Sequence, residues 1–195
     1  LKFIAKAIEK KIKNELAKML ESDREKYEEF WKAFGMQLKF GLYSDYGQHK
    51  DVLQDLVLFT SSNEKKLVTL KEYVSRMKEE QKSIYYACGE TVDKIEMLPQ
   101  CEAVTGKGFE VLYLTDDVDE FALKMLMNYE EKNFVNVCAE ELDISTEEEK
   151  EAVKAENESS EDMLTAMKEA LGDAVSAVRF TNALKNHPVC LTSEG

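Results

Sequence analysis

The hydrophobic positions at the start of the chain repeat with the period of an α-helix. Apolar residues follow one another at steps of three and four: Leu1, Ile4, Ile8, Ile12, Leu16 and Leu20. This spacing places them on one face of a helix, and we expect that face to be buried. Lysines occupy the other faces, where solvation explains them more simply than a partner-binding patch does.

A second helix is predicted to follow at once. Residues 22–25 have the sequence of a capping box, and Gly41 marks the expected end of the helix. The apolar stripe between these points is rich in aromatic side chains: Tyr27, Phe30, Trp31, Phe34 and Leu38. We interpret it as core packing rather than as a ligand platform. Apolar positions between His49 and Phe59 predict a third, shorter helix.

Beyond a polar loop at residues 60–66 the pattern alternates between strands and helices. β-branched and aromatic runs predict three strands: residues 83–88, 109–114 and 134–137. Helical spacing predicts three helices: residues 70–77 with Thr69 as the cap, residues 91–98, and residues 119–129. This alternation predicts βαβ units, a largely parallel sheet and helices on both of its faces. The fold class is therefore predicted to be α/β, preceded by a helical arm.

The last part of the chain has a different character. Residues 140–161 are acidic and polar, which is typical of a linker or of a solvated helix. A helix is predicted from residue 160 to Gly172, followed by strands at residues 175–180 and 189–191. This segment is too small to bury a core of its own. We therefore expect an incomplete α+β unit of a truncated domain.

The composition is that of a folded soluble protein. The chain has 195 residues, 44% of them hydrophobic and 33% charged, which suits one or two globular domains. Its net charge of −13 argues against nucleic acid as a partner, because phosphate binding needs a basic face. No apolar run approaches the roughly 20 residues of a membrane helix. The chain starts without Met and without a signal core, so we expect a segment of a longer protein.

The cysteines and histidines are too scattered to suggest a metal site. The chain contains these six residues of the two types: Cys88, Cys101, Cys138, Cys190, His49 and His187. Zinc sites need clustered ligands at short spacing, so we expect no bound metal. The spread of the cysteines through apolar segments, with no secretion signal, favours reduced thiols and a cytoplasmic location.

Two segments offer candidate chemistry for an independent α/β enzyme. Cys88 lies between a predicted strand and a predicted helix, where a thiol can be activated; a buried structural thiol is the simpler interpretation. The acidic run Asp116–Glu120 follows another strand and offers the ligand type that Mg²⁺ prefers, although helix capping explains it more simply. No nucleotide-binding or hydrolase motif accompanies either segment.

The predicted helix at residues 119–129 carries one large apolar residue beside its packing stripe. The stripe consists of Ala122, Met125, Leu126 and Tyr129. Phe121 lies at the margin of that stripe, between Glu120 and Lys124. A ring on a rim between charges suits weak, adaptable binding of apolar segments. The spacing equally allows Phe121 to fold back onto the sheet.

Four segments resemble sequences of the heat shock protein 90 family of ATP-dependent chaperones. Residues 30–41 (FWKAFGMQLKFG) resemble its FWxxFGxxLKxG segment, and residues 73–90 resemble its YVxRMKxxQKxIYYxxGE segment. Residues 109–120 are similar to its EVLxLTDxIDE segment, and residues 187–191 to a short proline-containing strand of its C-terminal domain. The resemblance covers nearly the whole chain and is greatest to the bacterial members.

The resemblance implies a domain organisation. Residues 1–60 would be the helical connector of the middle domain, 61–140 its small αβα sandwich, 141–160 an acidic linker, and 161–195 the start of a truncated C-terminal domain. The family's ATP and Mg²⁺ site lies in an N-terminal domain absent here, and the arginine loop that completes it would precede Leu1. The dimerising helices would follow Gly195. We therefore expect no cofactor and no ATPase activity in this chain, which should be monomeric, whereas the parent would be a homodimer.

The resemblance also implies a binding role. The family binds unfolded or partly folded client proteins, and in bacterial members the helix corresponding to residues 119–129 contributes, with a tryptophan where this chain has Phe121. By this resemblance Glu120, Phe121 and Lys124 are the candidate client-binding residues. The chain would relay ATP-driven closure from the absent N-terminal domain. A structural connector without client contact is the alternative within the same family.

Overall fold

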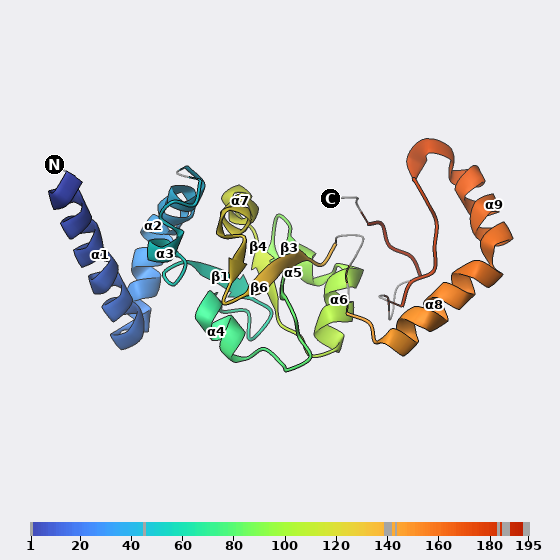
Figure 1. Cartoon of the computed structure of the whole chain (residues 1–195), viewed down its shortest axis with the longest axis horizontal. Coiled ribbons are helices and arrows are strands. Elements are labelled where there is room, and N and C mark those ends of the chain that lie inside the picture. Colours follow the sequence, from blue (N-terminus) through green and yellow to red (C-terminus); the bar gives the residue numbers. More distant parts are fainter. Residues whose placement is uncertain are drawn as a thin grey trace.

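The protein is an elongated chain of three parts (Figure 1). The structure is a computed structural model that describes residues 2–44, 46–138, 142, 144–182, 184 and 188–192, and at residues 2, 3 and 5 the backbone alone. A pair of long helices stands at one end, a six-stranded sheet with its helices in the middle, and a second pair of helices at the other end (Figure 1). Leu1 lies outside the described residues.

The first two helices are α1 (Lys2–Ser22) and α2 (Arg24–Ser44). Asp23 alone separates them, and its carboxylate accepts a hydrogen bond from the Lys26 N–H (3.2 Å), so this aspartate caps α2. The expected burial of the α1 stripe is wrong for its first half, because α1 diverges from α2 toward the N-terminus (Figure 1). Three isoleucines are each more than half exposed: Ile4, Ile8 and Ile12. Only the last turns of α1 pack against the core.

The core stripe of α2 differs from the predicted one. Tyr27 and Trp31 are buried as expected, while Phe34 is 53% exposed. The helix also continues through Gly41 to Ser44, so the predicted end at Gly41 is wrong. A methyl group at position 41 would meet only Leu53, at 3.5 Å, and the helical backbone there needs no glycine.

The predicted helix over residues 49–59 is right for one turn only and wrong for the rest of its length. The chain forms one helical turn, α3 (Lys50–Leu53), and then enters strand β1 (Leu58–Ser61), which pairs with β2 (Leu67–Thr69) in an antiparallel hairpin. The polar loop at residues 60–66 provides the turn of this hairpin. A short apolar run is equally compatible with a buried helix and with a fully buried strand. Residues Leu56–Phe59 are completely buried, and the pairing of β1 with its neighbours makes the end of this run a strand.

The sheet has the strand order β2-β1-β4-β3-β6-β5. The remaining strands are β3 (Ile84–Cys88), β4 (Val111–Leu114), β5 (Asn128–Tyr129) and β6 (Lys132–Asn136). β3 is parallel to both β4 and β6, as predicted for βαβ units. The outer pairs are antiparallel, so the largely parallel sheet of the prediction is limited to its three central strands.

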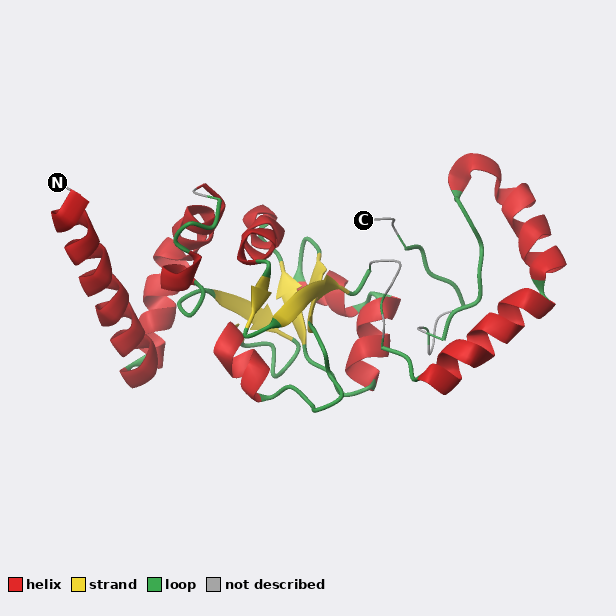
Figure 2. Cartoon of the chain, in the orientation of Figure 1, coloured by secondary structure: helices red, strands yellow, loops and turns green. Residues whose placement is uncertain are grey.

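Helices cover both faces of the sheet (Figure 2). They are α4 (Leu70–Ser75), α5 (Val92–Glu96), α6 (Pro99–Gly106) and α7 (Asp117–Leu126). Alternate residues of the central strands enter two apolar clusters. Tyr86 and Leu112 join the cluster with α2, α4 and α7, whereas Tyr85 and Val111 join the one with α5 and α6. Thr69 caps α4 as predicted.

The C-terminal part consists of α8 (Glu147–Ser159) and α9 (Glu161–Leu171), with a short 3-10 turn after it. The acidic segment is thus a solvated helix, one of the two predicted alternatives, and neither helix has a buried residue. The predicted strands at 175–180 and 189–191 are wrong, since these residues have no regular structure. Instead, the backbone of Phe180 forms two hydrogen bonds with the Asn157 side chain: its N–H donates to the amide oxygen and its carbonyl accepts from the amide nitrogen. His187, part of the resemblance, lies outside the described residues.

Candidate functional site

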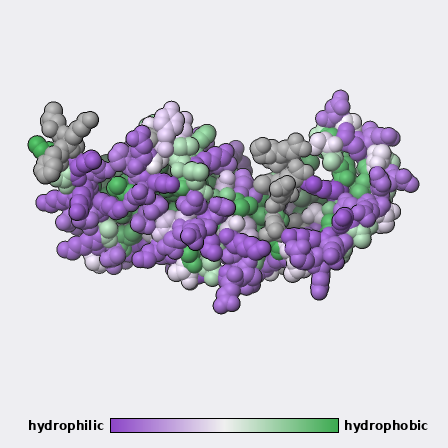
Figure 3. Space-filling view, viewed as in Figure 1, coloured by the Kyte–Doolittle hydropathy of each residue, from purple (hydrophilic) through white to green (hydrophobic). Residues whose placement is uncertain are grey.

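The side of the molecule where α2 meets α7 carries an exposed apolar surface. Met36, Phe40 and Tyr43 follow one another by four and three residues along α2, and Phe121 faces them from α7. The ring centroids of Tyr43 and Phe121 are 5.4 Å apart, and those of Phe40 and Tyr43 are 6.0 Å apart. All four residues are between 41% and 59% exposed. We call these four residues the aromatic patch; Figure 3 shows the apolar area over α7 within a largely hydrophilic face.

The position of Phe121 follows from the packing of α7. Ala122, Leu123 and Leu126 point into the core and are at most 1% exposed. Phe121 therefore lies on the outer side of the helix, 48% exposed, and does not fold back onto the sheet. The predicted packing stripe is right for Ala122 and Leu126, but it did not include Leu123, which is also buried. Tyr129 belongs to β5 rather than to the helix.

The other two candidate client-binding residues flank Phe121 on the same helix. The Glu120 carboxylate accepts a hydrogen bond from the Tyr86 hydroxyl (3.3 Å) and lies 3.5 Å from the Lys124 ammonium. Lys124 is exposed, while Glu120 is half-buried. The structure therefore brings the three residues together at the surface, with the aromatic ring beside a pair of opposite charges.

Beneath the aromatic patch, a buried lysine joins the two helices. Lys39 of α2 is 5% exposed and pairs with the carboxylates of Asp116, at 3.1 Å, and of Asp119. Its ammonium also lies 5.5 Å from the centre of the Trp31 ring and 5.2 Å from that of Phe59. Burial raises the pKa of Asp119, and the neighbouring lysine opposes that shift. Sequence analysis missed Lys39, although it follows Trp31 by eight residues and so lies on the buried side of α2.

This pairing accounts for the acidic run at residues 116–120. The backbone N–H of Asp116 donates to the Asp119 carboxylate (3.2 Å), which closes the first turn of α7 as the capping interpretation predicts. The Lys39 ammonium contacts the carboxylates of both Asp116 and Asp119. Among the described residues no group of three or more candidate ligands is arranged to hold a metal ion.

Cys88 lacks the environment of a catalytic thiol. Burial, together with the carboxylates of Glu120 and Asp119, raises the pKa of the Cys88 thiol to about 12. Nucleophilic cysteines instead have thiol pKa values lowered by a nearby cation or a helix N-terminus. The Cys88 thiol, although exposed, is therefore protonated at neutral pH, which argues against this cysteine as a nucleophile. All four cysteines of the chain are free.

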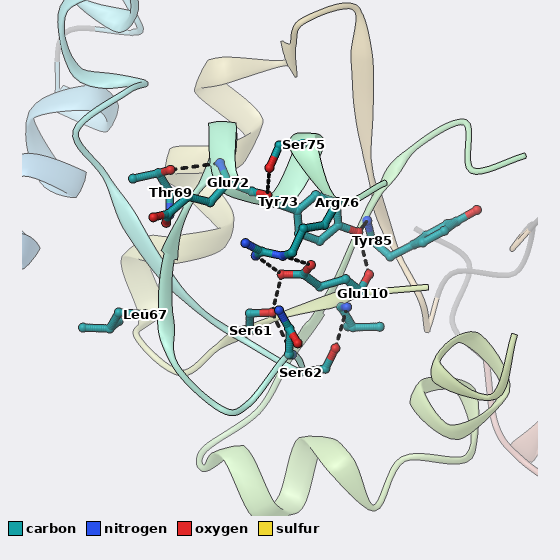
Figure 4. Close-up of polar contacts among 12 residues, drawn as sticks. Ser61, Ser62, Leu67, Thr69, Glu72, Tyr73, Ser75, Arg76, Tyr85 and Glu110 are labelled. Carbon is teal, nitrogen blue, oxygen red and sulfur yellow. Dashed lines mark hydrogen bonds and ion pairs between the residues drawn. The ribbon is translucent and has the colours of Figure 1, made fainter. Parts of the chain in front are cut away.

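A second polar network lies where α4 meets the sheet and explains polar residues of the motif at residues 73–90 (Figure 4). The Tyr73 hydroxyl donates to the carbonyl of Glu110 (2.5 Å) and accepts from the Gln81 amide (2.9 Å) and the Tyr85 N–H (3.0 Å). Arg76 forms two hydrogen bonds with the Glu110 carboxylate, at 2.7 and 3.0 Å. Tyr73, Arg76 and Gln81 of the motif therefore hold α4 against β3 and the start of β4.

No helix of the described residues is long and apolar enough to cross a membrane.

Comparison with known proteins assigns the family. The family model described as "Hsp90 protein" matches residues 1–195. The chain is 58% identical over 192 residues to the chaperone protein HtpG of Clostridium perfringens, and 56% identical over 195 residues to the HtpG proteins of Clostridium botulinum and Bacillus subtilis. These alignments cover 98–100% of this chain and 30–31% of each relative, so the chain spans about a third of their length. The chain belongs to the Hsp90 family.

Proposed function

We propose that this chain is part of an ATP-dependent molecular chaperone and that it holds partly folded client proteins on the aromatic patch. The observation that carries the proposal is the exposure of Phe121 in contact with Tyr43, at 48% and 41%. Family membership supports it, since the relatives are named chaperones. Unfolded chains offer apolar side chains without fixed geometry, and a flat, semi-exposed aromatic surface can bind many of them weakly.

The patch is rigid enough to be a surface rather than a loose collection of rings. Its two helices are joined from below by the ion pairs of the buried Lys39, and α7 is anchored through Leu123 and Leu126. The rings therefore remain at the surface because the helices cannot turn them inward. Pre-organisation of this kind lowers the entropy cost of each contact with a client.

The domain roles suggested by the resemblance are part of the same proposal. Residues 1–60 would be the helical connector of the middle domain, and residues 61–140 would form the sandwich that carries α7. Residues 161–195 would be the start of the C-terminal domain. Nucleotide hydrolysis and dimerisation would belong to the remainder of a longer parent in the cytoplasm. We accordingly expect no ATP turnover above buffer for this chain alone. Clear turnover would refute this assignment.

The test is suppression of aggregation of a heat-unfolded test protein. Phe121→Ala should weaken suppression about fivefold or more, which corresponds to about 1 kcal/mol of lost contact. Phe34→Ala is the matched control, because Phe34 is similarly exposed at 53% on another side of α2. Both variants should melt at the wild-type temperature. If Phe121→Ala suppresses aggregation as well as Phe34→Ala does, the chain is a connector without client contact.

A further inference from the structure

A groove continues the aromatic patch toward the start of α7. It has a volume of about 530 Å³ and runs between α2 and the first turn of α7. Its walls are formed by Met36, Gln37, Phe40, Thr115, Asp116, Asp117 and Val118. Met36 and Phe40 belong both to the groove and to the patch. Asp117 precedes Phe121 by about one helical turn. The two features thus form one continuous surface.

The floor and rim of the groove have negative charge. Its lining residues include two aspartates and no lysine or arginine. Asp116 shares the single positive charge of Lys39 with Asp119. Asp117 is exposed and has no ion pair or side-chain hydrogen bond to any described part of the chain. The positive end of the α7 dipole is already covered by these carboxylates, so the groove offers no place for an anion.

We propose that this surface selects client segments in which an apolar side chain and a lysine or arginine stand two residues apart. The inference rests on the proposed function and defines the class of segment that the patch binds. The apolar side chain contacts Phe121 and Tyr43, and the cation lies in the groove beside Asp117. Acidic segments are disfavoured because the groove and the chain, with its net charge of −13, both repel them.

The spacing follows from helix and strand geometry. Asp117 and Phe121 are four residues apart on α7, which separates them by about 6 Å along the helix axis. In an extended peptide residues i and i+2 point to the same side and lie roughly 6.6 Å apart. An extended client segment can therefore place an apolar residue and a cation on the two positions at once, with the intervening residue turned to solvent.

Binding of three short fluorescent peptides to the whole chain tests the inference. The first carries phenylalanine and arginine two residues apart, the second has glutamate in place of arginine, and the third has serine in place of phenylalanine. By anisotropy at low salt we expect the first to bind about fivefold or more tightly than either other peptide, and salt to reduce this preference. Asp117→Asn should reduce the preference for arginine, and Asp117→Lys should reverse it.

Asp93→Asn is the matched control, because Asp93 is likewise an exposed aspartate in the first turn of a helix, outside the groove. It should leave all three affinities unchanged. Equal affinity for the arginine and glutamate peptides, with Asp117→Asn silent, overturns the inference. The proposed function survives that outcome if Phe121→Ala still weakens aggregation suppression. If that substitution is silent as well, the proposed function fails together with the inference.

Discussion

Lys39 and Asp119 form an almost completely buried ion pair between α2 and α7, with the two residues 5% and 2% exposed. The pair connects the helical arm to the sheet domain directly below the aromatic patch. A buried pair contributes little net stability compared with apolar residues of the same shape, whereas removal of one partner leaves a buried charge uncompensated. This asymmetry makes the pair testable.

Lys39→Met should lower the free energy of unfolding by about 3–5 kcal/mol at neutral pH, as measured by urea denaturation. The loss should shrink as the pH falls. Burial already raises the pKa of Asp119, and without the lysine its carboxyl group can be buried at little cost only when protonated. The double variant Lys39→Met/Asp119→Leu should recover much of the loss. If the single and double variants are equally unstable, the ion pair is not what couples these positions.

Gly35 and Gly41 of α2 should respond to alanine in opposite directions. A methyl group at position 35 would lie 2.6 Å from Cε2 of Trp31, whereas at position 41 its nearest neighbour is Leu53 at 3.5 Å. Gly35→Ala should therefore displace the indole and destabilise the protein by about 1–3 kcal/mol. Gly41→Ala should stabilise it by up to about 1 kcal/mol through helix propensity.

Trp31 is the single tryptophan of the chain, so fluorescence reports on it alone. The emission of Gly35→Ala should shift to longer wavelength in the folded state, while that of Gly41→Ala should not. Unchanged emission and unchanged stability in Gly35→Ala would mean that the indole moves aside without cost.

Tyr73→Phe should destabilise the sheet domain by about 1–3 kcal/mol, because the buried hydroxyl makes three hydrogen bonds that phenylalanine cannot replace. The groups that lose this partner are the Tyr85 N–H, the carbonyl of Glu110 and the Gln81 amide, which keeps its hydrogen bond to the Ser83 carbonyl (2.8 Å). Tyr43→Phe is the matched control, since Tyr43 is 41% exposed and its hydroxyl can remain in water. Chemical denaturation should show a loss for position 73 only; equal effects would contradict a buried network around Tyr73.

Short-range patterns were sufficient to predict some elements, because the decisive interactions are local. Thr69 as the cap of α4 and the strand around Tyr85 depend on neighbours a few residues away. The spacing left open whether Phe121 is exposed, and the packing of α7 decides it. The strand β1 could not be recognised, since its four residues fit a helical stripe equally well until the sheet surrounds them.

The candidate site was predicted only on α7, because its other half depends on tertiary contacts. Met36, Phe40 and Tyr43 repeat at helical spacing, but α2 carries two apolar stripes and the spacing does not say which one is buried. Packing of Tyr27 and Trp31 against the sheet settles this and leaves the second stripe exposed. One signal was available in the sequence: Lys39 interrupts the apolar stripe of α2. A lysine buried at such a position needs an acidic partner from another part of the chain.

The Cys88 thiol gives the last prediction, which concerns alkaline pH. Its pKa is raised to about 12 in the folded protein, first by burial and then by Glu120 and Asp119, whereas an unfolded cysteine titrates near 8.5. Between these two pKa values the unfolded chain has lost the thiol proton and the folded chain still holds it. The contribution of Cys88 to stability is therefore fully present below the unfolded pKa and is lost as the pH rises toward the folded pKa. Replacement by serine removes this titration. The melting temperature of Cys88→Ser should therefore fall less between pH 8 and pH 10, values that bracket the unfolded pKa, than that of the wild type.

At neutral pH a thiol reagent should modify Cys88 in the folded protein far more slowly than after unfolding in urea. Rapid labelling of the folded chain at Cys88 would contradict the raised pKa and would restore the thiol as a candidate nucleophile.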